Sequence, residues 1–143
     1  MTVDTKDIKY FENYRHPDRF GALIGYRIVG FDRETREARV ALTVRDDHMS
    51  PANKVHGGVI SALLDYTCGI AVCTTLGKSD FCSTVELKVN YFRPVVRGEE
   101  LEATARVVFR GRKLCAMTAL LHRSGQVEPV AMATATFNVV EGP

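Results

Sequence analysis

A chain of 143 residues, 45% of them hydrophobic and 25% charged, suits one globular domain with a sizeable core. Its net charge of +2 is too small to indicate a nucleic-acid partner. The N-terminus is polar and carries acids, which argues against a signal peptide. The longest apolar stretch, 55–76, is interrupted by Asp65 and three glycines, which argues against a membrane span. These features predict a soluble cytoplasmic protein with no membrane partner.

The four cysteines form neither a CxxC pair nor a Cys/His cluster. Such spacing offers no set of metal ligands, so we expect reduced thiols packed in the core, as is usual in the cytosol. We accordingly expect neither a metal nor a redox cofactor.

The first part of the chain is expected to hold two strands behind an N-terminal arm of residues 1–20. Alternating apolar residues predict a strand over Ile24–Phe31 and another over Ala38–Val44, joined by a turn at 32–35. A polar loop broken by a proline follows at Arg45–Lys54.

The segment Gly58–Leu76 carries apolar residues at helical spacing, at positions 59, 63, 66, 70 and 73. Further apolar residues fill most of the other faces, so we expect a helix buried nearly all round. Gly77 is placed to end this helix.

From Thr84 onward the apolar period changes to two, which predicts four more strands. They are expected at Thr84–Phe92, Leu101–Phe109, Leu114–His122 and Val130–Val140. A flat sheet would leave one side of the helix wet, so a helix apolar on most faces requires a curved sheet wrapped around it. We therefore predict an α+β fold, a single domain of residues 1–143 in which an antiparallel curved sheet surrounds one long central helix.

Asp65 is the only formal charge within residues 55–77. A carboxylate in an apolar helix is costly unless it is hydrogen-bonded or its pKa shifts, which makes it a catalytic candidate. Just upstream, His56-Gly57-Gly58 leaves the backbone open, so that N–H groups at the helix start can meet an oxyanion or a carbonyl. The alternative is a structural Asp65 that accepts hydrogen bonds from a neighbouring strand.

The segment NKVHGGVISALLD, residues 53–65, resembles the helix motif of hotdog-fold acyl-CoA thioesterases, above all the phenylacetate-pathway (PaaI-like) branch. In that family a carboxylate follows the histidine of His-Gly-Gly by nine residues, as Asp65 follows His56. The run TVELKVNYFRP at 84–94 and the run RGRK at 110–113 are also similar to the family. The chain has no G-x-S-x-G, HExxH, P-loop or GxGxxG motif, which leaves Asp65 few rivals.

The resemblance implies a hotdog fold that hydrolyses an acyl-CoA to the free acid and CoA. Asp65 would be the nucleophile or the general base, and the Gly57 N–H would polarise the thioester carbonyl. His56 would shape the turn or bond near the thioester, and the Thr84 hydroxyl would orient the water or the carboxylate. Family active sites lie at a dimer interface, so these groups would come from two chains.

One position departs from the family pattern. Relatives often carry an asparagine six residues before the histidine, where it orients the water or the acid. This chain has Ser50 there, and its Asn53 lies three residues before His56. Ser50 would supply a weaker hydrogen bond, so Ser50 and Asn53 are the candidates for this role.

A CoA ester also needs cations opposite its phosphates. The expected substrate-binding residues are Gly58, Arg93, Arg110, Arg112 and Lys113. We expect a homodimer or a dimer of dimers (a homotetramer), because the apolar helix and an outer strand face at Cys115, Met117, Ala119 and Leu121 exceed what one chain covers.

Two other functions stay open at this point. One is a non-catalytic acyl-CoA binding module. The other is a hydratase-dehydratase acting on an enoyl or hydroxyacyl thioester, although such relatives usually place their histidine and carboxylate differently. The choice between aryl and alkyl acyl groups is not indicated by the sequence.

Overall fold

The computed structural model describes residues 17–142, so nearly all of the expected N-terminal arm lies outside the described residues. Within this range the chain forms a six-stranded antiparallel sheet in the order β1-β2-β4-β5-β6-β3. The strands are β1 (Arg27–Asp32), β2 (Glu37–Thr43), β3 (Phe81–Tyr91), β4 (Glu100–Arg110), β5 (Leu114–Arg123) and β6 (Pro129–Val140). The helical elements are α2 (Arg19–Ile24), the 3₁₀ turn η2 (Asp46–His48) and the long α3 (Gly57–Cys73).

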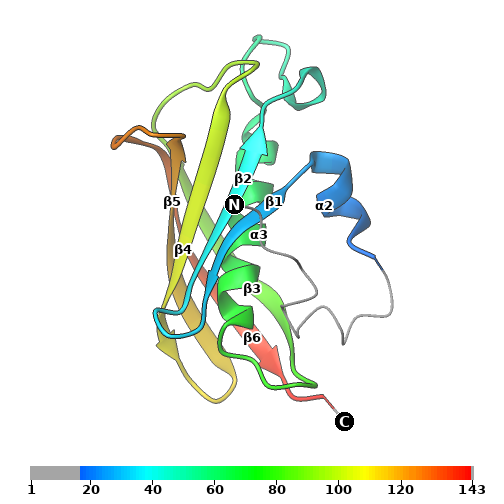
Figure 1. The fold of residues 1–143 in the computed structure, drawn as a ribbon, viewed down its shortest axis with the longest axis vertical. Coiled ribbons are helices and arrows are strands. Elements are labelled where there is room, and N and C mark those ends of the chain that lie inside the picture. The colour runs from blue at the N-terminus through cyan, green and yellow to red at the C-terminus, as the bar shows by residue number, and fades with distance from the viewer. Residues whose placement is uncertain (1–16, 143) are drawn as a thin grey trace.

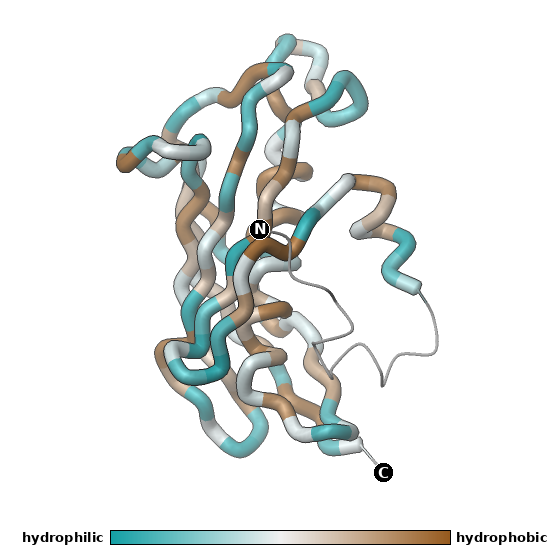
Figure 2. The backbone as a smooth tube through the Cα atoms, viewed as in Figure 1, coloured by the Kyte–Doolittle hydropathy of each residue, from teal (hydrophilic) through white to brown (hydrophobic). Residues whose placement is uncertain are grey.

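The sheet curves around α3, which packs against strands β2 to β6 (Figure 1). Inward-facing residues of these strands and one side of α3 form a single buried core. Hydrophilic residues gather in the turn between β1 and β2, where the chain leaves the core (Figure 2). The predicted α+β architecture, a curved antiparallel sheet around one long helix, is confirmed.

The helix α3 is buried on one side rather than nearly all round. A stripe of mostly small or polar residues along its other side stays partly exposed: Ser61, Ala62, Asp65, Tyr66 and Gly69. The wide apolar surface read from the sequence therefore divides into a core face and a second face that a single chain leaves partly open.

The end of α3 also differs from the prediction, because the helix stops at Cys73 rather than at Gly77. The hydroxyl of Thr74 donates to the Ala71 carbonyl at 2.6 Å, and that of Thr75 donates to the Val72 carbonyl at 2.8 Å. Two successive threonines thus satisfy carbonyls that a further helical turn would use.

The expected first strand was wrong at its start, since Ile24 ends the helix α2 and β1 begins at Arg27. Asp18 caps α2, accepting a 2.8 Å hydrogen bond from the Gly21 N–H. Gly25 ends the helix with a φ of 94°, a left-handed conformation that glycine adopts without strain.

The apolar row of β5 faces inward, so its assignment to an outer face was wrong. Cys115, Met117, Ala119 and Leu121 are all buried in the core of a single chain. The alternate residues face outward, and among them Leu114 and Leu120 are exposed. The row at 115–121 therefore gives no argument for self-association.

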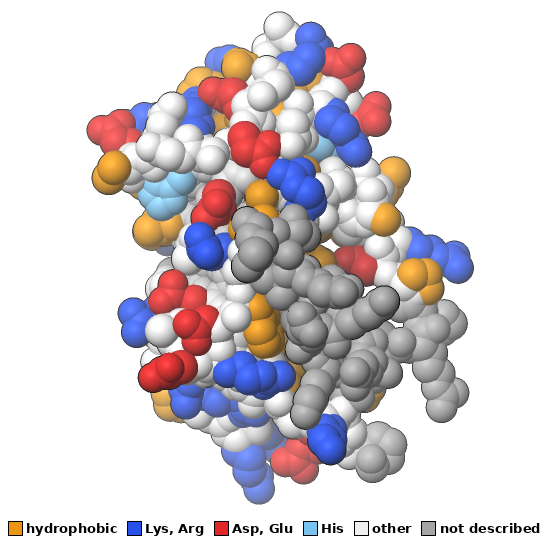
Figure 3. All heavy atoms as spheres, in the orientation of Figure 1, with side chains coloured by type: hydrophobic (Ala, Val, Ile, Leu, Met, Phe, Trp, Pro, Cys, Tyr) orange, Lys and Arg blue, Asp and Glu red, His pale blue; other side chains and the backbone are white. Residues whose placement is uncertain are grey.

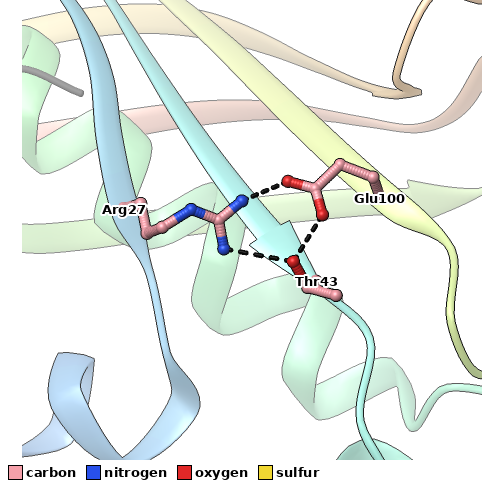
Figure 4. A network of polar contacts seen from close by, with 3 residues as sticks. All are labelled: Arg27, Thr43 and Glu100. Atoms are coloured by element: carbon pink, nitrogen blue, oxygen red, sulfur yellow. Dashed lines mark hydrogen bonds and ion pairs between the residues drawn. The ribbon is translucent and has the colours of Figure 1, made fainter. Parts of the chain in front are cut away.

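Polar side chains join the strands on the side where the helix does not cover the sheet. Arg27 on β1 forms an ion pair with Glu100 on β4 and donates a 3.2 Å hydrogen bond to the Thr43 hydroxyl on β2 (Figure 4). Acidic and basic side chains are interspersed over the visible face of the molecule (Figure 3). Exposed pairs of this kind contribute little stability each.

Candidate active site

Asp65 lies in the middle of α3 and faces β3. Its Oδ1 accepts a 2.7 Å hydrogen bond from the Thr84 hydroxyl. The pairing of β3 with β6 is irregular between Thr84 and Glu86, where one extra residue shifts the register. Such a bulge re-aims side chains, and here it directs Thr84 toward the helix. The carboxylate is thus held through one oxygen. Among the described residues its donor is a side-chain hydroxyl, whereas the structural alternative for Asp65 expected an N–H of a neighbouring strand.

The N-terminus of α3 is shaped by its histidine. His56 is the N-cap, and its Nδ1 accepts a 2.9 Å hydrogen bond from the Gly58 N–H. A Cβ on Gly58 would lie 3.0 Å from that ring nitrogen, so glycine fits this close approach. Gly57 is the first helical residue, where an N–H has no intrahelical acceptor. Within residues 17–142 this N–H is therefore available to an external oxygen.

Two residues beside Gly57 were not predicted as part of the site. The Tyr91 hydroxyl on β3 donates to the Gly57 carbonyl at 3.2 Å and also forms a hydrogen bond with the Ser61 hydroxyl on α3. The period-two pattern of β3 puts Tyr91 on the same face as Leu87 and Val89, a signal that could have directed it toward the helix. These contacts tie the start of α3 to the strand that carries Thr84.

An open pocket of about 320 Å³ adjoins this end of the helix. It is lined in part by Lys54, Gly57, Tyr91 and Arg93. Arg93 forms an ion pair of 2.7 Å with Glu128 and donates to the Pro129 carbonyl at 3.0 Å. Of the four basic residues expected to bind substrate, Arg93 is thus the one that lines a pocket together with Gly57.

Ser50 and Asn53 lie in a tight turn just before the helix. The Ser50 N–H donates to the Lys54 carbonyl at 2.7 Å, and the Asn53 N–H donates to the Ser50 carbonyl at 3.0 Å. Asn53 has a φ of 58°, a conformation that asparagine adopts more readily than most residues. The backbone therefore gives a sufficient reason for an asparagine at this position.

The other three basic residues lie at the opposite end of the molecule. The Arg110 Nε donates to the Thr75 hydroxyl at 3.0 Å, just beyond the C-terminus of α3. Arg112 and Lys113 are exposed and line a second pocket of about 490 Å³ together with Glu141. A helix of this length spans ~25 Å, so within one chain these cations are remote from Gly57.

Two tyrosines that are affected by nearby carboxylates stack on each other. The rings of Tyr26 and Tyr66 are 4.7 Å apart between centroids and 30° from parallel. Burial raises the pKa of Tyr66. The Asp18 carboxylate raises this pKa further, through its charge and through a hydrogen bond with the phenol. Burial likewise raises the pKa of Tyr26, reinforced by the charges of Asp18 and Asp65. The Tyr26 hydroxyl is buried and has no hydrogen-bond partner in the described part of the chain.

All four cysteines are free, and three of them, Cys68, Cys73 and Cys115, are buried. Burial raises the pKa of the Cys68 thiol to about 12, with the nearby charge of Asp65 adding to the effect. The thiol therefore stays protonated at neutral pH, when it is a poor nucleophile.

No group of three or more possible metal-ligating side chains occurs within residues 17–142. None of the helices in this range combines the length and apolar character needed to cross a membrane.

Similarity to known proteins agrees with the fold. Residues 52–130 match the Thioesterase superfamily. The medium/long-chain acyl-CoA thioesterase YigI of Escherichia coli strain K12 is 32% identical over 131 residues, covering 79% of this chain and 83% of the relative. A phenylacetic acid degradation-related protein of Ralstonia eutropha JMP134 is 29% identical, with a TM-score of 0.81 over 92% of this chain and 98% of that chain. A mutant of the phenylacetic acid degradation protein PaaI of Thermus thermophilus is 28% identical, with a TM-score of 0.75 over 85% of this chain and 98% of that chain.

The curved sheet around one helix is thus a hotdog fold of the PaaI-like type, as the resemblance implied. The chain belongs to the thioesterase superfamily and is a thioester hydrolase.

Proposed function

We propose that the protein hydrolyses acyl-CoA thioesters to the free acid and CoA, with Asp65 as base or nucleophile. The observation that carries the proposal is the Asp65 carboxylate, which accepts from Thr84 through one oxygen, while no donor to its second oxygen is found among residues 17–142. The names of two relatives, the E. coli acyl-CoA thioesterase and the mouse acyl-coenzyme A thioesterase 13, support CoA as the carrier.

In the general-base route, a water oxygen attacks the thioester carbonyl carbon while its proton passes to Asp65. The charge that develops on the carbonyl oxygen is stabilised by the Gly57 N–H, a contribution of ~3 kcal/mol for one preorganised donor. The C–S bond then breaks, and the CoA sulfur takes the proton from Asp65. In the nucleophilic route the carboxylate itself attacks the carbonyl carbon, the C–S bond breaks and CoA leaves as the thiolate. Water then hydrolyses the mixed anhydride to the free acid and the Asp65 carboxyl, whose proton passes to the CoA sulfur.

The two groups that act on one carbonyl should come from different chains. Asp65 follows Gly57 by eight residues on the same helix, a rise of ~12 Å, whereas a nucleophile and an oxyanion donor must both lie ~3 Å from the reacting group. We therefore propose a homodimer, or a dimer of dimers, with the active site between chains. The exposed edge strand β3, which carries Thr84, is next to Asp65 and available for such a contact.

The remaining predicted residues take supporting roles in this proposal. His56 holds the first turn of α3 through Gly58, which keeps the Gly57 N–H directed outward. Ser50 and Asn53 are proposed to act on the water across the same interface. Lys54 and Arg93 lie at the oxyanion end, whereas Arg112 and Lys113 are proposed to bind the nucleotide, presented by a neighbouring chain.

A steady-state assay of CoA release tests the reaction. Hexanoyl-CoA, benzoyl-CoA and phenylacetyl-CoA are each incubated with the protein and a thiol-reactive dye, with a blank for the protein's own thiols. We expect Asp65→Asn to lower kcat by ~10²–10⁴ while thermal unfolding stays unchanged. Asp32→Asn, the same chemical change at the exposed last residue of β1, is the matched control and should keep full activity.

Three results would contradict parts of the proposal. Unchanged kcat in folded Asp65→Asn returns this residue to a structural role. Tight binding of all three esters without turnover indicates a binding module. Loss of enoyl absorbance with crotonyl-CoA, without CoA release, indicates a hydratase.

Mixing two inactive variants tests the shared site. Gly57→Pro removes the N–H at the first helical position, where proline is well tolerated. A dimer of this variant with Asp65→Asn contains one intact site, so equal amounts that exchange freely should recover about a quarter of wild-type activity. No recovery after exchange has been demonstrated, for example with two affinity tags, contradicts a site between chains.

A further inference from the structure

His48 is a buried histidine within the loop that the sequence describes as polar. Only 1% of it is exposed, and both ring nitrogens have partners. The Arg45 N–H donates to Nδ1 at 3.0 Å, and Nε2 lies 2.8 Å from the Ile24 carbonyl. Because Nδ1 accepts, the proton is on Nε2, which donates to Ile24. The ring thus joins the end of α2 to the turn η2.

The backbone of the same residue holds the start of α3. The His48 carbonyl accepts a 2.8 Å hydrogen bond from the His56 N–H, and an isolated β-bridge pairs Met49 with Val55. Residues 48–56 therefore form a loop closed at its base by His48 and His56. Gly57 follows directly, so its N–H takes a direction set by this closure.

A second hydrogen bond holds the 48–56 loop independently of His48. The Val55 N–H donates to the Val95 carbonyl at 2.8 Å, between β3 and β4. Loss of the His48 ring contacts should therefore shift His56 and Gly57 rather than unfold the loop. A small shift is enough to matter, because an oxyanion donor acts only within hydrogen-bond distance of the developing charge.

We propose that His48 is a positioning residue for thioester hydrolysis, which sets the direction of the Gly57 N–H through the η2 turn and the His48–His56 backbone hydrogen bond. This inference rests on the proposed function of Gly57. The ring contact that matters is the one to Arg45, because that bond closes η2 and fixes where the His48 carbonyl points.

Two amide variants separate the two ring contacts. The side-chain oxygen of Asn can take the place of Nδ1 and accept from Arg45, whereas Gln reaches the place of Nε2 and can donate to Ile24. We expect His48→Gln to lower kcat about tenfold with KM within twofold of wild type. We expect His48→Asn to keep kcat within about threefold. Thr74→Val removes a buried hydroxyl, and with it one hydrogen bond, at the far end of α3. It controls for lost stability and should leave kcat unchanged.

A double-mutant cycle with Gly57→Pro gives the decisive readout. If His48 acts through the Gly57 N–H, His48→Gln should lower the residual kcat of Gly57→Pro by less than twofold, although it costs tenfold in wild type. A merely structural histidine would lower both rates by the same factor.

The outcomes are distinguishable from failure of the proposed function. A wild-type protein that releases no CoA contradicts the proposed function itself. An active wild type with unchanged kcat in His48→Gln, or equal losses in the wild-type and Gly57→Pro backgrounds, overturns the positioning role. Activity kept by His48→Gln but lost by His48→Asn overturns the assignment to the Arg45 contact.

Discussion

The Thr84 hydroxyl donates a 2.7 Å hydrogen bond to Oδ1 of Asp65, joining the edge strand β3 to the middle of the long helix. This contact explains how a carboxylate is retained among the apolar residues of α3. It also restrains the rotamer of the side chain. The position of Asp65 therefore depends on β3 as much as on its own helix.

The first prediction concerns that hydrogen bond. Thr84→Val keeps the shape of the side chain but removes the donor, whereas Thr84→Ser keeps the hydroxyl. Hydrogen bonds to charged groups contribute ~1.5–3 kcal/mol, so we expect Thr84→Val to lower kcat at least tenfold and Thr84→Ser to stay within threefold of wild type. Steady-state CoA release checks both values. Equal activity in the two variants would mean that the hydroxyl does not orient Asp65 during turnover.

The second prediction concerns the first turn of α3. A Cβ on Gly58 would lie 3.0 Å from the His56 ring and displace this cap, whereas a Cβ on Gly57 would meet Tyr91 at an ordinary 3.5 Å. Loss of a helix cap costs ~1 kcal/mol. We expect Gly58→Ala to unfold at a temperature roughly 3 °C below that of Gly57→Ala. Differential scanning calorimetry measures the difference, and identical midpoints would refute the capping role of the ring.

The third prediction contrasts the stacked tyrosines. Tyr26→Phe removes a buried hydroxyl that has no partner in the described part of the chain, so stability should be unchanged or higher. Tyr66→Phe removes a hydroxyl that is hydrogen-bonded to Asp18, so it should cost ~1 kcal/mol of unfolding free energy. Urea unfolding of both variants checks the order. A larger loss in Tyr26→Phe would mean that its hydroxyl has a partner in solution.

The fourth prediction concerns the nucleotide of the substrate. Arg112→Ala and Lys113→Ala should each raise KM for an acyl-CoA about tenfold with little change in kcat, the pattern of lost uniform binding. A pantetheine ester of the same acyl group has no nucleotide and should be unaffected. Arg93→Ala is the comparison at the other end of α3. If it alone raises KM for the CoA ester, the nucleotide binds at the Gly57 end instead.

Much of the fold could be predicted because burial imposes simple periods on the sequence. The change from helical spacing before Gly77 to alternation after Thr84 located α3 and the four strands that follow it. Alternation does not say which face points inward, and for this reason Cys115–Leu121 was assigned to the wrong side of β5. The helix α2 was missed because it is one and a half turns long, too short for a hydrophobic period.

The candidate site could be predicted only where a local motif marks it. The run His56-Gly57-Gly58 and the spacing to Asp65 lie within one segment, and both the cap and the open N–H follow from that segment. Tyr91 contacts Gly57 and Ser61 from another element of the fold, and the His48 ring reaches back to Ile24 at the end of α2. The alternation of β3 assigns Tyr91 to a face but does not name its partners, and no motif marks His48 as buried, so the structure was needed to find these contacts.

The distance along α3 between Gly57 and Asp65 has a consequence for how the protein behaves at low concentration. If one chain supplies the oxyanion donor and another supplies the base, an isolated chain has both groups but too far apart to act on one substrate. The amount of active enzyme then follows the association equilibrium of the chains. Specific activity should then fall on dilution through the dissociation constant of the dimer and return on reconcentration. The protein would hydrolyse thioesters in proportion to its paired population rather than to its total amount.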